Sequence, residues 1–462
     1  KNPTKIRMNI VHAQQARQVV DRMIGFKISP LLSKLIVHDS KSFLSAGRCQ
    51  TPTLRLVYDR HQESKRLKDS GIFYKVEGDF VDNPTISVKL NVKFDHVEKV
   101  HLFFEKSKTF SHILSIFPKV NRSSSPPQPF STSKLLQHAS TVLHLSPKVT
   151  MDMCQKLYQG GYITYMRTES VRYSTTYLRQ AKEYITDHYG ESYVGGTDRI
   201  QNNDSNNPHE AIRVTQLFMR EVEDVKLQSL YNVIWRRSVE SCMSVYEYEE
   251  HIVNISAPDT CKYETSIEVP IFLGWKGSMI PKGDFHKMQE KASNIVFSLK
   301  HFDNKKVSFV EIRSIMSIGE QEKHYQEASL IQKLESLGIG RPSTFSMLVE
   351  TVQERKYVLK ENLDGVEKNG TEYIMNKSRE IVDKSVKKIF GSKKNQLCVQ
   401  DLGIKAIDVL YEHFAPLFDY EYTRNMESAL DALVQDNDIP WYSVCEVCED
   451  TINRCSEQLK PV

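Results

Sequence analysis

The spacing of apolar residues changes repeatedly along the chain and separates helical stretches from β-rich ones. Between residues 9 and 38, apolar side chains recur every third or fourth position at Ile10, Ala13, Ala16, Val19, Val20, Met23 and Ile24. This period predicts an amphipathic helix, and Gly25 lies near its expected end. A second helix is expected over SAGRCQTPTLRLVYDRHQE, beginning after the small residues Ser45–Gly47.

Apolar and polar positions alternate in two later stretches, which predicts strands. The first, from about Gly71, contains IFYKVEGDF, TISVKLNVKF and HLFFEK, and it ends in the linker-like sequence NRSSSPPQP. The second, over 251–313, contains HIVNISAP, KYETSIEVPIFLGW, NIVFSLKHF and KVSFVEIRSI. The simplest topology is one β domain, which a helical insertion interrupts.

Helical periodicity dominates the remaining segments, 130–250 and 320–460. The last third is expected to pack against residues 1–65, because those N-terminal helices otherwise lack a partner. A chain of 462 residues is too long for one core, so two to four domains are expected.

Composition limits the possible classes of function. The chain is 40% hydrophobic and 26% charged, which is ordinary for a globular protein, and no apolar run is long enough to span a membrane. The formal net charge of +4 excludes a uniformly basic surface but not a local basic groove.

The eight cysteines are scattered, and most lie in apolar contexts typical of reduced, buried thiols. Cys445 and Cys448 form a CxxC pair that Cys455 follows. A zinc knuckle needs a fourth ligand at suitable spacing, and the sequence offers none there. We therefore expect no metal ion to be bound by this segment.

The segment Gly161–Ser170, GYITYMRTES, carries the strongest chemical signal. Tyr165 and Arg167 are two residues apart in what we predict to be a short strand, so both side chains point the same way. A phenol can attack a phosphodiester, and a guanidinium can hold two phosphate oxygens in its fork. The alternative is that Tyr165 only fills a core, as tyrosines in β-branched surroundings commonly do.

Three further motifs suit phosphate binding, although each also has a structural explanation. In AQQARQVVDR, Arg17 and Asp21 are four residues apart on a helix and could form a surface ion pair. SAGRCQT and GIGRPST place small residues, hydroxyls and an arginine before expected helices, where backbone amides can bind a phosphate or simply cap the helix. HEAIR is predicted to lie on one helical turn after a polar loop.

These motifs together resemble type IA DNA topoisomerases. SAGRCQTPTLRL, PFSTSKLLQHAS, ITYMRT, HEAIRVT and the segment Glu327–Val358 occur in that family's order, with similar separations, over nearly the whole chain. Met166 before the arginine is more similar to the topoisomerase I branch than to the topoisomerase III branch, which usually has proline there.

The resemblance implies a multidomain α+β fold, a discontinuous toroid with helical, winged-helix base and lid domains and a β-rich arch. The expected boundaries are base 1–65, arch 66–124, lid 125–251, arch 252–316 and base 317–462.

The resemblance also implies the roles of individual residues. Tyr165, Arg167 and His209 would be catalytic. DNA contacts would come from Arg17, Asp21, Ser45, Arg48, Gln50, Thr168, Arg213, Arg341, Ser343 and Thr344. Many relatives have a second arginine where this chain has Gln18, so a base preference carried over from that helix is uncertain.

The expected activity is transient cleavage of one DNA strand through a 5′-phosphotyrosine, followed by strand passage and religation, which relaxes negative supercoils without ATP. The family's toprim domain supplies ligands for Mg²⁺, and no acidic cluster of that kind is visible here, so we expect this chain to be a fragment that binds no Mg²⁺ alone. The expected partners are DNA and the toprim domain, and the expected state is an intracellular, DNA-associated monomer.

Two other functions remain open at this point. A non-catalytic single-stranded DNA-binding protein could use the same scaffold with a basic groove and aromatic stacking. A tyrosine recombinase or type IB enzyme would place an HxxR-type element before the tyrosine, whereas His209 follows Tyr165 and its spacing to Arg213 is HxxxR.

Overall fold

The chain is built around three separate hydrophobic cores. The computed structural model describes residues 6–36, 44–66, 71–81, 83–202, 209–319, 324–435 and 439–457. Two of the cores lie within helical bodies and the third lies on a large antiparallel sheet. We call these bodies the base, the lid and the arch. The boundaries given above remain our proposed division into domains.

The base combines both ends of the described chain. Its helices are α1 (Met8–Ile36), α2 (Gln50–Arg66), α9 (Glu327–Ser336), α10 (Phe345–Glu354), α11 (Asp401–Phe418), α12 (Tyr420–Gln435) and α13 (Ser443–Glu457). Helix α1 packs on α11, α12 and α13, and α2 packs on α9, α10 and α11. The N-terminal helices therefore bury their apolar stripes against the last third of the chain, as the sequence predicts. Gly25 does not end α1, which continues to Ile36.

The lid is a compact insertion with its own core between Phe130 and Met243. Its α-helices are α4 (Thr132–Val142), α5 (Pro147–Gln159), α6 (Thr175–His188) and α7 (Gln228–Glu240). Helices α4, α5 and α6 each begin after a serine whose side chain accepts a hydrogen bond from a backbone amide of the first turn, so these starts are fixed by local sequence.

The arch is one ten-stranded antiparallel sheet in the order β11-β10-β8-β1-β2-β6-β5-β3-β7, with β4 paired to β5. The strands are β1 (Ile72–Phe80), β2 (Ile86–Phe94), β3 (Ile113–Ile116), β4 (Val120–Ser124), β5 (Tyr246–Ser256), β6 (Lys262–Phe272), β7 (Lys305–Lys306), β8 (Phe309–Ile318), β10 (Val366–Asn376) and β11 (Ile381–Phe390). Strands from before the lid pair with strands from after it, as β1 does with β8 and β2 with β6. The prediction of one β domain with a helical insertion is confirmed.

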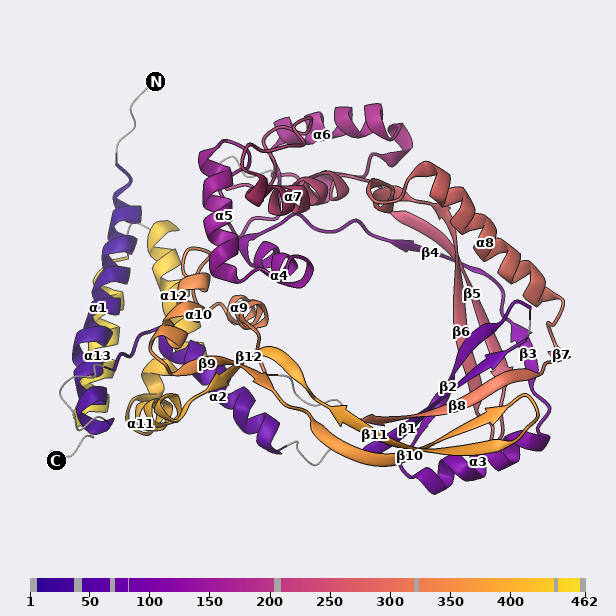
Figure 1. Ribbon diagram of the computed structural model, residues 1–462. Helices are drawn as coiled ribbons and strands as arrows, with labels where there is room; N and C mark the ends of the chain where they lie inside the picture. The colour runs from indigo at the N-terminus through magenta and orange to yellow at the C-terminus, as the bar shows by residue number, and fades with distance from the viewer. Residues whose placement is uncertain are drawn as a thin grey trace.

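Base, lid and arch are arranged in a ring, which Figure 1 shows. The lid contacts the base through α4 on α9 and through α5 on α10. On the other side of the ring, β9 (Val358–Leu363) and β12 (Lys393–Val399) pair beside α10. The chain between these two strands forms the hairpin of β10 and β11. Strand β10 then pairs with β8, which joins the base to the arch sheet.

Several sequence-based assignments are wrong. HLFFEK belongs to α3 (Val97–Thr109), because Val100, Phe103, Phe104 and Ser107 are buried at helical spacing. NIVFSLKHF lies mostly in α8 (Lys282–Lys300), and part of the expected linker forms β4. The last third is not all helical, since 358–399 contains four strands. In β10 only Met375 is fully buried, so the alternation that marks a strand is weak.

The base core gives a test of this architecture. Ile407 in α11 is fully buried, so Ile407→Ala is expected to lower the local free energy of unfolding by about 2–5 kcal/mol through lost transfer energy and a cavity. Hydrogen exchange of α11 peptides, read by mass spectrometry, measures this change. Val447→Ala is the matched control, because Val447 is 57% exposed and its truncation should change stability by no more than about 0.5 kcal/mol. Equal effects would contradict the assigned packing.

Candidate active site and nucleic-acid interface

The segment that carries Tyr165 is irregular rather than a strand. Only Ile163 makes a β-bridge there, with Val214, so the predicted strand over GYITYMRTES is wrong. The expected orientation is nevertheless retained. Tyr165 is 40% exposed and Arg167 is exposed, whereas Met166 and Thr168 between and after them are buried. Both candidate catalytic groups therefore reach solvent from one short stretch.

Hydroxyl groups hold this segment in place of a regular strand ladder. The Thr132 hydroxyl donates to the Met166 carbonyl at 2.6 Å, and the Thr168 amide donates to Thr132 Oγ1 at 2.9 Å. The Thr132 amide also donates to the Thr168 carbonyl. On the other side, the Thr164 amide donates to the Arg213 carbonyl and its hydroxyl to the Ala211 carbonyl, both at 2.9 Å. Sequence analysis missed Thr132, although it lies within the PFSTSK motif.

Tyr165 packs edge to face on Tyr158, with ring centroids 5.2 Å apart. Tyr158 is at the end of α5 and is 41% exposed, so the pair forms a small aromatic surface. A ring held at its edge keeps its hydroxyl end free to face a ligand. This geometry places a nucleophile candidate on a fixed scaffold without burying it.

HEAIR is extended rather than helical, so its prediction as one helical turn is wrong. Ile212 and Val214 make β-bridges with Phe130 and Ile163, and His209 is exposed at the start of the segment. Arg213 does not face outward as a free phosphate ligand. Its Nε and Nη2 donate to the two carboxylate oxygens of Glu210 at 2.9 and 2.8 Å, and its side chain is 12% exposed. In this structure Arg213 fixes the HEAIR backbone through Glu210, and its contact with DNA stays a prediction.

In the base, SAGRCQT folds into a turn before α2, as predicted. Gln50 Nε2 donates to Ser45 Oγ at 3.0 Å, and the Tyr357 hydroxyl accepts from the Ser45 amide at 2.9 Å. Ser45 and Gln50 are thus neighbours, and both remain predicted DNA contacts. Arg48 differs, because its side chain is only 4% exposed and points into the base.

GIGRPST forms a tight turn that leads into α10. Gly340 has a φ of +83°, and a Cβ there would meet Leu348 at 3.0 Å, so the position requires glycine. The Arg341 amide donates to the Thr344 hydroxyl at 2.9 Å, and Ser343 is exposed. The Thr344 hydroxyl therefore already supports the turn, while Ser343 stays available for the predicted DNA contact.

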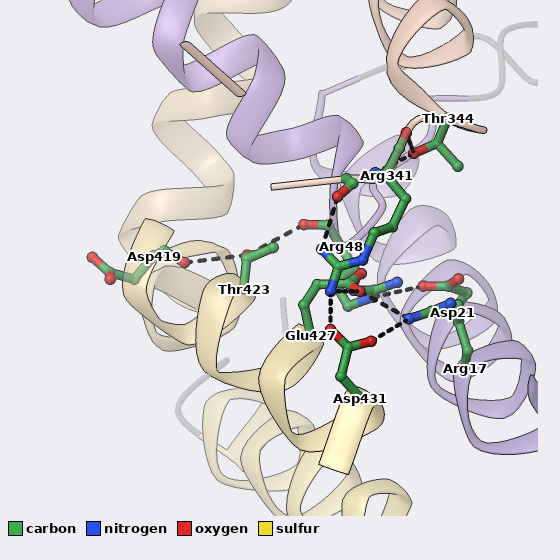
Figure 2. A network of polar contacts seen from close by, with 10 residues as sticks. Arg17, Asp21, Arg48, Arg341, Thr344, Asp419, Thr423, Glu427 and Asp431 are labelled. Carbon is green, nitrogen blue, oxygen red and sulfur yellow. Dashed lines mark hydrogen bonds and ion pairs between the residues drawn. The ribbon is translucent and has the colours of Figure 1, made fainter. Parts of the chain in front are cut away.

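The arginines of the three base motifs, Arg17, Arg48 and Arg341, converge on one buried carboxylate, Glu427 of α12 (Figure 2). Arg17 lies 2.9 Å and Arg341 3.3 Å from Glu427 Oε2, and Arg48 binds Oε1. We call Arg17, Asp21, Arg48, Arg341, Glu427 and Asp431 the arginine–carboxylate network.

Two exposed carboxylates complete the network. Asp21 pairs with Arg48 at 2.9 Å, and Asp431 pairs with Arg341 and lies 3.7 Å from Arg17. The possible ion pair between Arg17 and Asp21 is not formed, because each takes a different partner.

Sequence analysis missed Glu427 and Asp431. Both acids directly follow buried apolar residues of α12, Met426 and Leu430, which could have indicated that they lie near the core side of the helix. Acidic residues on a helix usually face solvent, so this signal is weak. Burial alone would raise the pKa of Glu427, yet Arg48, Arg17 and Arg341 hold it below its ordinary value. Glu427 is therefore ionised and links three segments that are distant in sequence.

Glu169 connects the lid to this network. It follows Tyr165 by four residues, and its charge interacts with those of Arg341, Asp431 and Glu427 in the base. Part of its surface is exposed, but protein atoms across the junction displace bulk water, so desolvation raises its pKa. Asp431, Glu335 and Glu427 act in the same direction, against Arg341. The segment that carries Tyr165 thus lies within electrostatic reach of Arg341 in the base.

The cysteines of α13 are part of the base core. Cys445, Cys448 and Cys455 are buried, and burial raises the pKa of Cys448 to about 11. Within the described ranges, no group of three or more His, Cys, Asp or Glu side chains has a geometry that could hold a metal ion.

Among the described residues, no helix is long and apolar enough to cross a membrane.

The buried carboxylate predicts a pH-dependent stability. Because the pKa of Glu427 is lower in the folded base than its ordinary value of 4.5, its contribution is present above that pH and is lost as pH falls through the folded pKa. Glu427→Gln should lose this dependence and reduce the unfolding free energy of the base at neutral pH by about 3–5 kcal/mol, because Arg48 stays buried without its partner.

Urea unfolding between pH 7 and pH 3 measures both effects. Glu421→Gln is the matched control on the same helix, because Glu421 is 71% exposed in a surface pair with Arg424 and should contribute only about 0–1 kcal/mol. If the two variants behaved alike, the role given to Glu427 would be wrong.

Comparisons with known proteins identify the family. The model of a family described as DNA topoisomerase matches residues 5–373. The chain is 32% identical to "DNA topoisomerase 1 type prokaryotic" of Acanthamoeba polyphaga mimivirus, over 93% of this chain and 55% of that protein. It is 31% identical to DNA topoisomerase 1 of Buchnera aphidicola subsp. Acyrthosiphon pisum (strain APS), over 100% of this chain and 49% of that protein.

A solved structure gives the same result. Full-length topoisomerase I from Thermotoga maritima matches with a TM-score of 0.74 and 26% identity, covering 100% of this chain and 71% of that chain. The chain spans about half the length of the curated relatives it matches. Because the family match extends over most of the described residues and the fold agrees, the chain belongs to the type IA DNA topoisomerases, on the side of the bacterial topoisomerase I branch.

Proposed function

We propose that this chain is the lid, arch and base portion of an enzyme that cuts and reseals one DNA strand through Tyr165. The observation that carries the proposal is the exposure of Tyr165 and Arg167 on a clamped segment, whose neighbour Glu169 interacts electrostatically with Arg341 of the base. A nucleophile, a cation and a phosphate-binding surface are thereby associated across the junction of lid and base.

The proposed reaction is a transesterification. The Tyr165 oxygen attacks the phosphorus of a phosphodiester, the bond from phosphorus to the 3′-oxygen breaks, and the 3′-oxygen leaves with a proton as a hydroxyl. The phenolic proton is lost, and the 5′-phosphate remains as a phosphotyrosine ester. Arg167 stabilises the charge that develops on the phosphoryl oxygens. The reverse attack by the 3′-hydroxyl reseals the strand without a nucleotide cofactor.

Mg²⁺ is not assigned to residues of this chain. Its described part offers no cluster of three acidic or other ligating side chains, so these residues do not fit a magnesium site. In the proposal, the acidic ligands come from a toprim domain. His209, exposed at the start of HEAIR, is proposed to contact the phosphate or the neighbouring acids.

The first test compares two touching tyrosines. With the toprim domain of a type IA topoisomerase joined to the chain, Tyr165→Phe should abolish the covalent DNA adduct and the relaxation of negatively supercoiled plasmid. Tyr158→Phe, the matched control, should retain both, because it removes a hydroxyl from the neighbouring, equally exposed tyrosine and leaves the proposed nucleophile in place.

The adduct is detected as labelled DNA that stays with denatured protein in a gel. An adduct formed by Tyr165→Phe would reject the assignment of the nucleophile. If the parent also formed none while still binding single strands, the non-catalytic DNA-binding function would be favoured.

A second test concerns the cation. Arg167→Ala should slow single-turnover cleavage of an oligonucleotide by about 10²–10³-fold, the usual effect of removing one group that stabilises transition-state charge. Arg167→Lys should recover only part of the rate, because an ammonium cannot form the two-pronged contact. Arg172→Ala serves as the control, since Arg172 is exposed and, among the described hydrogen bonds, its side chain makes one, to the Gln201 carbonyl at 3.4 Å. A rate for Arg167→Ala equal to that of the control would remove Arg167 from the mechanism.

A further inference from the structure

The arginine–carboxylate network is electrically balanced before any DNA is present. Arg17, Arg48 and Arg341 supply three positive charges, and Asp21, Glu427 and Asp431 supply three negative charges (Figure 2). Glu169 adds a further negative charge within electrostatic reach. A phosphate that approaches these guanidinium groups therefore meets sites that carboxylates already fill.

Two carboxylates on the same helix differ sharply in their surroundings. Glu427 is 4% exposed and contacts all three arginines, whereas Asp431, one helical turn later, is 53% exposed and contacts only Arg17 and Arg341. Breaking the contacts between the arginines and Glu427 would cost much free energy, because Arg48 would remain buried with an unpaired charge. Breaking the ion pairs between Asp431 and its arginines would cost little, because surface ion pairs contribute only about 0–1 kcal/mol.

We infer that Asp431 holds the place of a DNA phosphate on Arg17 and Arg341, and that a bound single strand displaces its carboxylate while Glu427 stays as the residue that positions the arginines. The inference rests on the proposed function, since it assumes that a strand crosses this surface of the base. It assigns opposite roles to two acids four residues apart, which their charges alone would not distinguish.

The hydrogen-bonding capacity of the arginines supports this exchange. A carboxylate and a phosphate present similar pairs of oxygens to a guanidinium fork, so one can replace the other without rebuilding the site. Arg341 is 25% exposed and Arg17 is 31% exposed, so both can be reached from solvent. Arg17 Nε is buried and has no hydrogen-bond partner within the described residues, so this arginine is not fully satisfied by its present carboxylates.

Glu169 of the lid lies within electrostatic reach of the groups that exchange. When the Asp431 carboxylate leaves Arg341, that arginine gains a phosphate partner of the same sign, and the charges around Glu169 are rearranged next to the segment of Tyr165.

The test measures binding of a fluorescently labelled single-stranded oligonucleotide by anisotropy, over a range of salt concentrations, with the chain as it is. Asp431→Asn should bind about two- to fivefold more tightly at low salt, which is the fold-change equivalent of losing one competing surface ion pair. The slope of log K against log salt should become steeper by about 0.7, because the phosphate on Arg17 and Arg341 then releases its counterion without a displaced carboxylate taking one up.

Two comparison variants make the result specific. Glu421→Gln removes the same charge from the same helix, but in a surface pair with Arg424, and should change neither affinity nor slope. Glu427→Gln should bind more weakly than the parent, because the arginines lose their common anchor. Should Glu427→Gln fail to fold, the comparison of Asp431→Asn with Glu421→Gln still decides the question.

The possible outcomes separate the inference from the function on which it rests. A parent chain that binds no single strand at any salt concentration would overturn the proposed function itself. A parent that binds, with Asp431→Asn weaker than or equal to Glu421→Gln, would overturn the place-holding role alone. Equal tightening by Asp431→Asn and Glu421→Gln would show a general charge effect and would also overturn it.

Discussion

The base depends on one buried carboxylate that gathers three arginines from three parts of the chain. Glu427 lies on α12, while its partners come from α1, from the turn before α2 and from the turn before α10. Neither the Glu427 carboxylate nor the Arg48 guanidinium could be buried there alone, so each makes the burial of the other possible. The surface that we propose for the DNA strand is therefore set by an interaction beneath it rather than by the exposed side chains alone.

The lid solves a different problem, which is to fix a nucleophile without covering it. Its core ends beneath Ile163, Met166 and Thr168, and the intervening Tyr165 and Arg167 are left outside. Threonine hydroxyls take over the hydrogen bonds that a neighbouring strand would otherwise make. Because these bonds involve backbone atoms, the side chains of Tyr165 and Arg167 remain uncommitted to the support of the fold.

The sequence was sufficient for features that depend on local patterns. The helices that begin at residues 8 and 50, five arch strands (β1, β2, β5, β6 and β8) and the outward orientation of Tyr165 and Arg167 follow from apolar periodicity and from i, i+2 spacing. Features that depend on distant partners were not predictable in this way. Arg48 and Glu427 are 379 positions apart, and nothing in either local sequence marks the other as a partner. Likewise, Arg213 looks like a free cation until Glu210 is seen to occupy its fork.

The β10–β11 hairpin makes the junction between base and arch harder to separate than the junction between lid and base. At the first junction, β10 shares main-chain pairing with β8, and Met375 is sunk into the arch core. At the second junction, lid and base meet through helix faces and the surface pair of Lys148 and Glu350. Parting a ladder exposes backbone groups and buried hydrocarbon together, whereas parting two helix faces leaves every backbone bond intact. A force that opens the ring would therefore separate the lid from the base first, beside Tyr165, while the β10–β11 hairpin keeps the base attached to the arch.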